Sequence, residues 1–178
     1  MAIDLAAFKT AMRQLAGHVC IITTASRQGA RRGLTATAVC CVSATPPMLL
    51  GCVNRQSGSH AAIVEAGIFA VNVLPFEDRH LADRFSGTIA GDARFADGVW
   101  RILETGAPVL ESALASFDCQ LVQAVDVATH GILFGAILEV RVRKTKARPL
   151  LYAHGSYGIF TALAPEASPD LLLPWDTL

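Results

Sequence analysis

Hydroxyl and amide side chains are concentrated in residues 33–59, GLTATAVCCVSATPPMLLGCVNRQSGS, and these are the side chains best suited to binding chemistry. Read as one strand, residues 33–44 place Thr35, Thr37 and Ser43 on one face and small apolar side chains on the other. Short side chains let backbone amides approach a flat polar ring. The β propensity of threonine explains the same pattern without any ligand, so both interpretations stay open here.

Ser57 and Ser59 end this stretch, where a polar loop meets an expected helix. Hydroxyl groups and the free N–H groups of a first helical turn can converge on an anion such as a phosphate. The alternative is that Ser59 is an ordinary helix cap. The residues alone therefore indicate a site for a flat, phosphorylated ligand, without naming it.

Other chemistry has weaker support in the sequence. The five histidines show no i, i+4 spacing and no Cys-x-x-Cys pair joins them, so no metal site is predicted. A G-x-S-x-G nucleophile elbow and a G-x-G-x-x-G dinucleotide loop are also missing. Arg84 beside Phe85 could reach an anion or could be solvated, and His130 could be a site residue or a plain turn residue.

Composition narrows the class of protein. The 178 residues predict one domain over 1–178, and 15 basic against 15 acidic residues indicate neither nucleic acid nor a membrane surface as partner. Only 17% of residues are charged and 52% are hydrophobic, which predicts a subunit interface or a sizeable ligand site. No apolar run resembles a signal peptide or membrane span, and the five cysteines lack a pairing pattern, so we expect a cytoplasmic protein with reduced thiols.

Strand-like segments outnumber helical ones along the chain. Helices are expected at 5–16 after the cap Asp4, at 60–66 between the cap Ser59 and Gly67, and at 77–86, and strands at 18–26, 33–44, 48–53, 68–74, 117–128, 132–144 and 150–152. Three glycines make 87–98 the expected mobile loop. Because the strands do not alternate regularly with helices, the pattern favours a mainly β antiparallel barrel with a few covering helices.

An ordered series of sequence blocks resembles the flavin reductase family, the small reductase component of two-component flavin-dependent monooxygenases of the 4-hydroxyphenylacetate 3-monooxygenase type. The series begins with GLTATAVCCVSATPPMLLGCVNRQSGSH and continues through FAVNVL, RFSG, ARFADGVW, GAPVLESALASFDCQL, THGILFGAI and PLLY. Together the blocks cover roughly residues 5–160. A single block would be weak evidence, but the ordered series is specific to the family.

The resemblance implies a Greek-key-like, FMN-binding split β-barrel, usually a homodimer, that reduces FMN or FAD with NADH or NADPH and supplies reduced flavin to a separate monooxygenase. By resemblance, the flavin-binding residues are Thr35, Ala36, Thr37, Ser43, Asn54, Ser57, Ser59, Arg84, Phe85, Ser86 and Tyr152. His130 corresponds to the histidine on the nicotinamide side. The alternatives are a pyridoxamine-phosphate oxidase-like protein of the same barrel and a non-catalytic flavin or haem binder. In the homodimer, the tail residues 171–175 are expected to pack on a neighbouring surface.

Overall fold

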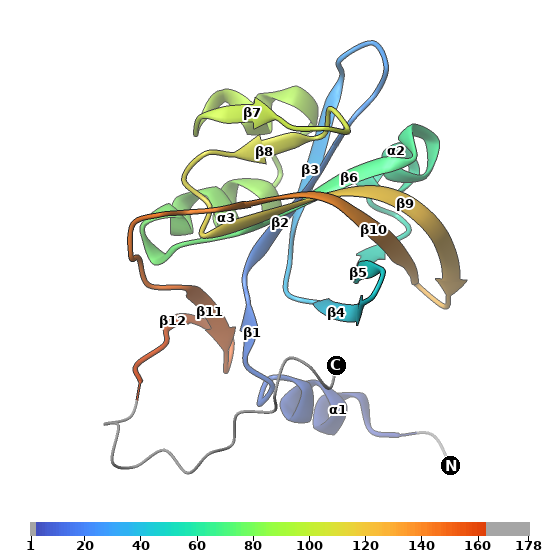
Figure 1. Ribbon diagram of the computed structural model, residues 1–178. Helices are drawn as coiled ribbons and strands as arrows, with labels where there is room; N and C mark the ends of the chain where they lie inside the picture. Colours follow the sequence, from blue (N-terminus) through green and yellow to red (C-terminus); the bar gives the residue numbers. More distant parts are fainter. Residues whose placement is uncertain (1–2, 163–178) are drawn as a thin grey trace.

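A computed structural model describes residues 3–162, in which antiparallel strands dominate (Figure 1). The helices are α1 (Leu5–Met12), α2 (Gly58–Ala66) and α3 (Arg79–Ser86), with short 3-10 helices η1 (Phe76–Asp78) and η2 (Gly91–Ala96). The strands are β1 (Gly17–His18), β2 (Cys20–Ala25), β3 (Arg31–Ala36), β4 (Val39–Ala44), β5 (Pro47–Asn54), β6 (Ile68–Val73), β7 (Trp100–Ile102), β8 (Pro108–Leu110), β9 (Ala115–Val127), β10 (His130–Val142), β11 (Leu150–Ala153) and β12 (Ser156–Ile159).

Seven strands form the main sheet, in the order β3-β2-β6-β9-β10-β5-β4, and every neighbouring pair is antiparallel. Two small sheets, β1-β11-β12 and β7-β8, lie beside it. The expected mainly β architecture with a few helices is therefore confirmed, and the sheet is strongly curved in Figure 1.

The strand expected over 33–44 is in fact two strands, and the expectation of one continuous strand is wrong. The chain leaves β3 after Ala36, bends at Thr37 and re-enters a strand at Val39. β3 pairs with β2, whereas β4 pairs with β5, so the two strands lie at opposite ends of the seven-strand order. Because two residues join these two edges, the sheet must curl to bring the edges close together. The Cys52 N–H donates to the Ala38 carbonyl at 2.9 Å, which extends the β4–β5 pairing by one residue into this connection.

Two expected helix boundaries also need correction. Asp4 does cap α1, since its carboxylate accepts from the N–H groups of Ala6 and Ala7, but the helix ends at Met12 and not at residue 16. In α2 the cap is Ser57, whose Oγ accepts from the Ser59 N–H at 3.2 Å. Helix α2 ends as expected at Gly67, which has a left-handed φ of 70°.

The core is divided by β2, whose side chains are buried on both faces. Ile22 packs inside the curved sheet with Phe69, Cys119 and other apolar side chains of β5, β6, β9, β10 and α2. Ile21 points the other way, into a second cluster under α3 and η2 that includes Phe85. A strand buried on both faces explains the unbroken apolar run at its start.

Gly135 on β10 is a sensitive point of the barrel interior. A Cβ added there would lie 2.5 Å from Phe69 Cζ and 2.9 Å from Cys119 Cβ, and both of these side chains are fully buried. We therefore predict that Gly135→Ala lowers the free energy of unfolding by about 1–3 kcal/mol through overpacking, measured as a lower urea midpoint. Gly158→Ala, where the new methyl meets nothing within 4 Å, is the matched control and should leave the midpoint nearly unchanged. Equal midpoints for the two variants would contradict the described packing.

Candidate functional site

Two clefts lie along β3, one beside each half of the strand. The first has a volume of about 430 Å³ and is lined by Arg32, Gly33, Ser57, Gly58, Ser59, Ala90, Gly91 and Arg94. The second has a volume of about 250 Å³ and is lined by Val19, Thr35, Ala36, Thr37, Ser86, Tyr152 and Tyr157. Since 32–33 and 35–37 are successive parts of one stretch of chain, an elongated ligand lying along β3 can reach both clefts.

The first cleft is suited to an anion. Among the described residues, its lining includes two guanidinium groups and no carboxylate. Arg94 donates to the carbonyls of Gly33, Gly87 and Ile89, and Arg32 donates once, to the Arg31 carbonyl, so each retains unused N–H donors from the five of a guanidinium. Burial lowers the pKa of Arg94, but an arginine stays charged at neutral pH. The N-terminus of α2 adds the Ser57 and Ser59 hydroxyls and its own partial positive charge.

The second cleft combines a short-chained strand end with two aromatic rings. Thr35 uses its hydroxyl to donate to the Ala82 carbonyl of α3 at 2.7 Å, which fixes α3 against β3. Tyr152 and Tyr157 meet edge to face, with ring centroids 5.5 Å apart. The Tyr157 hydroxyl donates to Asp83 Oδ1 at 3.0 Å. Within residues 3–162 the outer edge of β3 has no strand partner. Two carbonyls of β3, those of Arg31 and Gly33, accept from arginine side chains.

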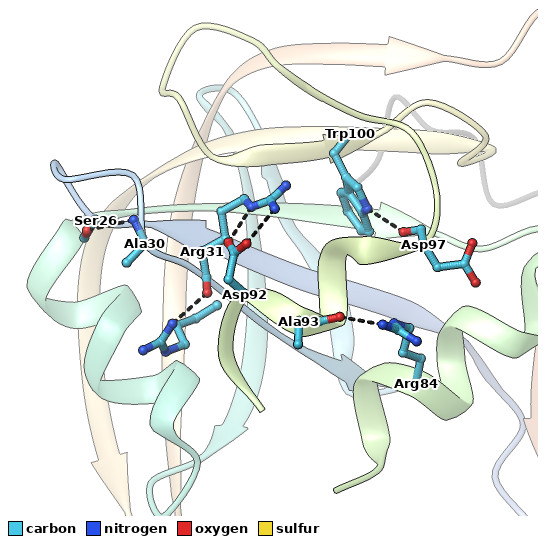
Figure 2. A network of polar contacts seen from close by, with 9 residues as sticks. Ser26, Ala30, Arg31, Arg84, Asp92, Ala93, Asp97 and Trp100 are labelled. Carbon is cyan, nitrogen blue, oxygen red and sulfur yellow. Dashed lines mark hydrogen bonds and ion pairs between the residues drawn. The ribbon is translucent and has the colours of Figure 1, made fainter. Parts of the chain in front are cut away.

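Residues 87–98, expected to be a mobile loop, contain η2 and are tied to the body of the protein (Figure 2). Arg31 forms a bidentate ion pair with Asp92, at 2.7 and 2.8 Å. The Arg84 guanidinium donates to the carbonyls of Ala93 and Arg94. These contacts hold η2 beside β3, where it closes one side of the first cleft.

The structure brings together seven of the residues expected at the site. Ser57 and Ser59 line the first cleft, and Thr35, Ala36, Thr37, Ser86 and Tyr152 line the second. Sequence spacing accounts only for the residues of β3 itself. The residues of α2 and β11 lie beside β3 because of the tertiary fold.

Five expected residues lie outside these two clefts. Arg84 bonds to backbone carbonyls of η2, and Phe85 is 1% exposed and packs against Phe95 and Trp100. The Ser43 hydroxyl accepts from the Thr45 N–H in the corner after β4. Asn54 and His130 face each other as register partners on β5 and β10. Asn54 lines a third, polar cleft of about 530 Å³ at the tip of the β9–β10 hairpin.

Sequence reasoning misses both arginines of the first cleft. Arg32 lies in a charged segment whose pattern indicates a turn, and Arg94 lies in the segment expected to be mobile. The alternation of side chains along β3 could have predicted that Arg32 lies at the cleft. Nothing in the local sequence indicates that Arg94 lies near Ser57. Within residues 3–162, no group of three or more His, Cys, Asp or Glu side chains could hold a metal ion. No helix in that range is long and apolar enough to cross a membrane.

The fold is a curved antiparallel sheet of the split-barrel class, and the two clefts along one of its strands have the shape and charge to suit an elongated anionic ligand. Residues 12–161 match the flavin reductase like domain. The chain therefore belongs to the flavin reductase family, which confirms the resemblance noted in the sequence.

Individual relatives agree with this family. FMN reductase (NADH) RutF 1 of Methylorubrum extorquens is 44% identical over 155 residues, which are 87% of this chain and 76% of that protein. A homologue of nitrilotriacetate monooxygenase component B from Mycobacterium thermoresistibile is similar in structure, with a TM-score of 0.85, 30% identity, and coverage of 98% of this chain and 95% of that one. BorF, the flavin reductase component of a bacterial two-component tryptophan halogenase, has a TM-score of 0.81, 27% identity, and coverage of 90% and 100%. These likenesses confirm the split-barrel fold and favour a flavin reductase over the pyridoxamine-phosphate oxidase-like and non-catalytic alternatives.

Tyr157 gives a spectroscopic test of the second cleft. Burial, followed by the hydrogen bond to Asp83 and the charge of Asp83, raises the pKa of Tyr157 from 10.0 to about 12. We predict that Asp83→Asn lowers this pKa but leaves it above 10, because the burial remains. The pKa of Tyr157 is measured by following tyrosinate absorbance during alkaline titration. Subtracting the titration curve of the Tyr157→Phe variant removes the signal of Tyr152.

The sign of the linked stability change follows from the raised pKa. The unfolded chain loses the Tyr157 proton near pH 10 and the folded chain near pH 12, so the tyrosine's contribution to stability is full below pH 10 and is lost as the pH rises toward 12. Asp83→Asn should narrow the pH interval between loss of the Tyr157 proton in the unfolded chain and its loss in the folded chain. An unchanged Tyr157 midpoint in Asp83→Asn would contradict the hydrogen bond.

Proposed function

We propose that the protein is a flavin reductase that uses NADH to reduce FMN. The observation that carries the proposal is the pair of clefts on β3, one cationic and rich in hydroxyls, the other lined by short side chains and tyrosines. Four residue steps separate Gly33 from Thr37, which is about 13 Å of extended chain. A phosphate in the first cleft and a ring in the second would be joined by a ribityl chain along the strand.

The charge of the first cleft supports FMN over FAD. Arg32 and Arg94 supply two positive charges, which match the dianion of a terminal phosphate monoester better than a diphosphate link whose phosphates carry one charge each. η2 also closes one side of this cleft, where FAD would need room for its adenosine half. The NADH named for the RutF relative supports NADH as the reductant.

Reduction of a flavin by hydride transfer requires no acid or base group of the protein. When both nucleotides are bound, a hydride passes from the nicotinamide ring to the flavin ring, so the reactive atoms belong to the nucleotides. The protein binds the phosphate, orients the ring through the free edge of β3 and holds the two rings at reacting distance. Ser57, Ser59, Thr35, Ala36, Thr37, Ser86 and Tyr152 are the proposed flavin contacts, with Arg32 and Arg94 added.

The remaining expected residues take other proposed roles. Arg84 and Phe85 support η2 and α3 rather than contacting the flavin, since their partners are backbone carbonyls and buried rings. Ser43 makes a local hydrogen bond in its corner. Asn54 lies beside His130, which we place on the nicotinamide side.

Ser57 and Ser59 provide the first test of this assignment. We predict that Ser57→Ala/Ser59→Ala weakens FMN binding, because each hydrogen bond to a charged oxygen contributes about 1.5–3 kcal/mol. Riboflavin lacks the phosphate, so its affinity should change little in the same variant. Flavin fluorescence titration measures both affinities, and circular dichroism checks the fold.

Ser26→Ala is a matched control, since Ser26 also accepts from a backbone N–H but lines neither cleft. Unchanged FMN affinity in the double variant, or an equal loss for riboflavin and FMN, would place the phosphate elsewhere.

His130 provides the second test. It is exposed at the start of β10, and its ring nitrogen Nδ1 lies 2.8 Å from Thr129 Oγ1. Hydride transfer requires no proton from it, so its proposed role is to orient the nicotinamide. We predict that His130→Ala raises the KM for NADH or lowers kcat, while FMN affinity changes by less than about tenfold, or 1.4 kcal/mol. Loss of FMN binding with normal NADH kinetics at saturating FMN would move His130 to the flavin site.

A homodimer is proposed from apolar surface that the described part of the chain leaves exposed. Helix α1 has no buried residue there, and the apolar side chains of α1 and the turn after it, Leu5, Phe8, Met12 and Leu15, are 45–65% exposed. A short helix is not stable in water without an apolar partner surface. An apolar cleft of about 450 Å³, lined by His18, Val39, Cys40, Cys41, Met48, Leu49, Val73, Phe117 and Ile137, offers such a surface to a second copy.

We predict that sedimentation at micromolar concentration gives a dimer and that Phe8→Glu shifts it toward monomer. Phe8 is 45% exposed, so the change costs little in an isolated protomer but would bury a charge in the interface. A wild-type monomer would contradict the dimer. The tail segment 171–175, expected to pack on a neighbouring surface, lies outside the described residues.

Reduced flavin would leave the site to supply a separate monooxygenase. The names of the two structural relatives support a two-component system, one naming a component of a monooxygenase and the other the reductase component of a tryptophan halogenase. We also propose that 1–178 is one flavin reductase-like domain and that it works in the cytoplasm, where its five free cysteines would stay reduced. Following NADH oxidation with added FMN tests the activity. A purified protein that binds FMN but oxidises no NADH would favour a pyridoxamine-phosphate oxidase-like or non-catalytic role.

A further inference from the structure

The tip of the β9–β10 hairpin is held to the loop before α2 by a set of polar contacts around Asp126. Asp126 Oδ2 lies 3.0 Å from Arg55 Nε, and Asp126 Oδ1 lies 3.6 Å from His60 Nε2. Arg55 belongs to the loop before Ser57, and His60 belongs to the first turn of α2. One carboxylate of the hairpin therefore contacts both the loop and the helix that carry the proposed phosphate site.

Arg55 also binds the backbone of the hairpin turn. Its N–H donates to the Thr129 carbonyl at 3.0 Å, and its Nη1 donates to the Ala128 carbonyl at 3.3 Å. Ala128 has a φ of 49°, a left-handed conformation that is unfavourable for alanine. The turn immediately before His130 is thus kept in a strained conformation by hydrogen bonds from Arg55, and Asp126 holds the Arg55 side chain in place.

His60 fixes the other side of the hairpin. Its side chain is 12% exposed, and Nε2 has no hydrogen-bond partner among the described residues. A Cβ added at Gly131 would overlap with this nitrogen, so the ring rests directly on the backbone next to His130. Asp126, at 3.6 Å, is the charged group that the structure places beside Nε2.

We propose that Asp126 is a positioning residue for NADH: it acts through Arg55 and His60 to hold the hairpin turn, and with it His130, at a set distance from the phosphate site. This inference rests on the proposed function, because His130 is placed there beside the nicotinamide. It adds a mechanical link between the two nucleotide subsites. The α2 end of the link is anchored by buried Ser59 and Ile63, whereas the hairpin tip is exposed, so loosening the link should displace the hairpin.

The first test compares Asp126→Asn with Glu111→Gln. Both changes remove one exposed carboxylate from an ion pair with arginine, but the Arg101–Glu111 pair lies beside β7 and β8 and contacts neither subsite. Asp126→Asn should raise the KM for NADH by about fivefold, with FMN affinity unchanged within about twofold, and Glu111→Gln should change neither. Equal effects of the two variants, or an FMN loss as large as the NADH effect, would overturn the proposal.

A double-mutant cycle tests the route through His130. If Asp126 acts by placing His130, Asp126→Asn should have almost no further effect on NADH kinetics in a His130→Ala background. Additive effects would overturn this route. Hydrogen exchange of the amides of 128–131, measured without substrates, should be faster in Asp126→Asn than in Glu111→Gln, and equal rates would overturn the positional link.

These measurements separate the inference from the proposed function. A wild-type protein that oxidises no NADH in the presence of FMN contradicts the proposed function. A fully active wild type with an indistinguishable Asp126→Asn variant contradicts only the role of Asp126.

Discussion

The rest of the structure depends on a covalent constraint: two residues, Thr37 and Ala38, join the opposite edges of the seven-stranded sheet. β3 is the strand at one edge of the sheet and β4 is the strand at the other. A two-residue connection cannot span a flat seven-stranded sheet, so the sheet must curl. Curling brings the two edges together, but within residues 3–162 no regular ladder forms between β3 and β4 or β5. The barrel is therefore split along β3, and the free edge of that strand is where both clefts are found.

Burial of β2 on both faces secures this arrangement. One face supports the interior of the barrel and the other supports α3 and η2. Since α3 also receives the Thr35 hydrogen bond, the strand that lines the clefts is held by the same layer that covers β2. A change in core packing would thus be transmitted to the strand that lines the two clefts with few intervening contacts.

Arginines make most of the polar contacts around β3, and they do so in different ways. Arg31 and Arg84 are engaged with η2, by an ion pair and by backbone hydrogen bonds. Within the described part of the chain, Arg94 and Arg32 each use only some of their five donors, and both line the first cleft. A planar group with five donors can hold a loop and still face an anion, which a lysine ammonium would do less well. Positioning and electrostatics are the means that a hydride-transfer site needs, because the nucleotides supply the reacting atoms.

The sequence by itself determined the class of fold, the family and the short-chained strand end at Thr35–Thr37, because periodicity, turn residues and ordered blocks are local properties of the chain. It also predicted that Ser57 and Ser59 lie where a polar loop meets a helix, since that junction has a local signature, although the cap is Ser57 and not Ser59. Tertiary structure alone decided that 33–44 divides into two strands, since the break is imposed by pairing with β2 on one side and β5 on the other. It also decided which arginines face the cleft: Arg84 was expected there, yet its guanidinium is directed to the carbonyls of η2, while Arg32 and Arg94 come from distant segments of the chain. Charge at a site depends on which segments meet in space, and no spacing along the chain encodes that meeting.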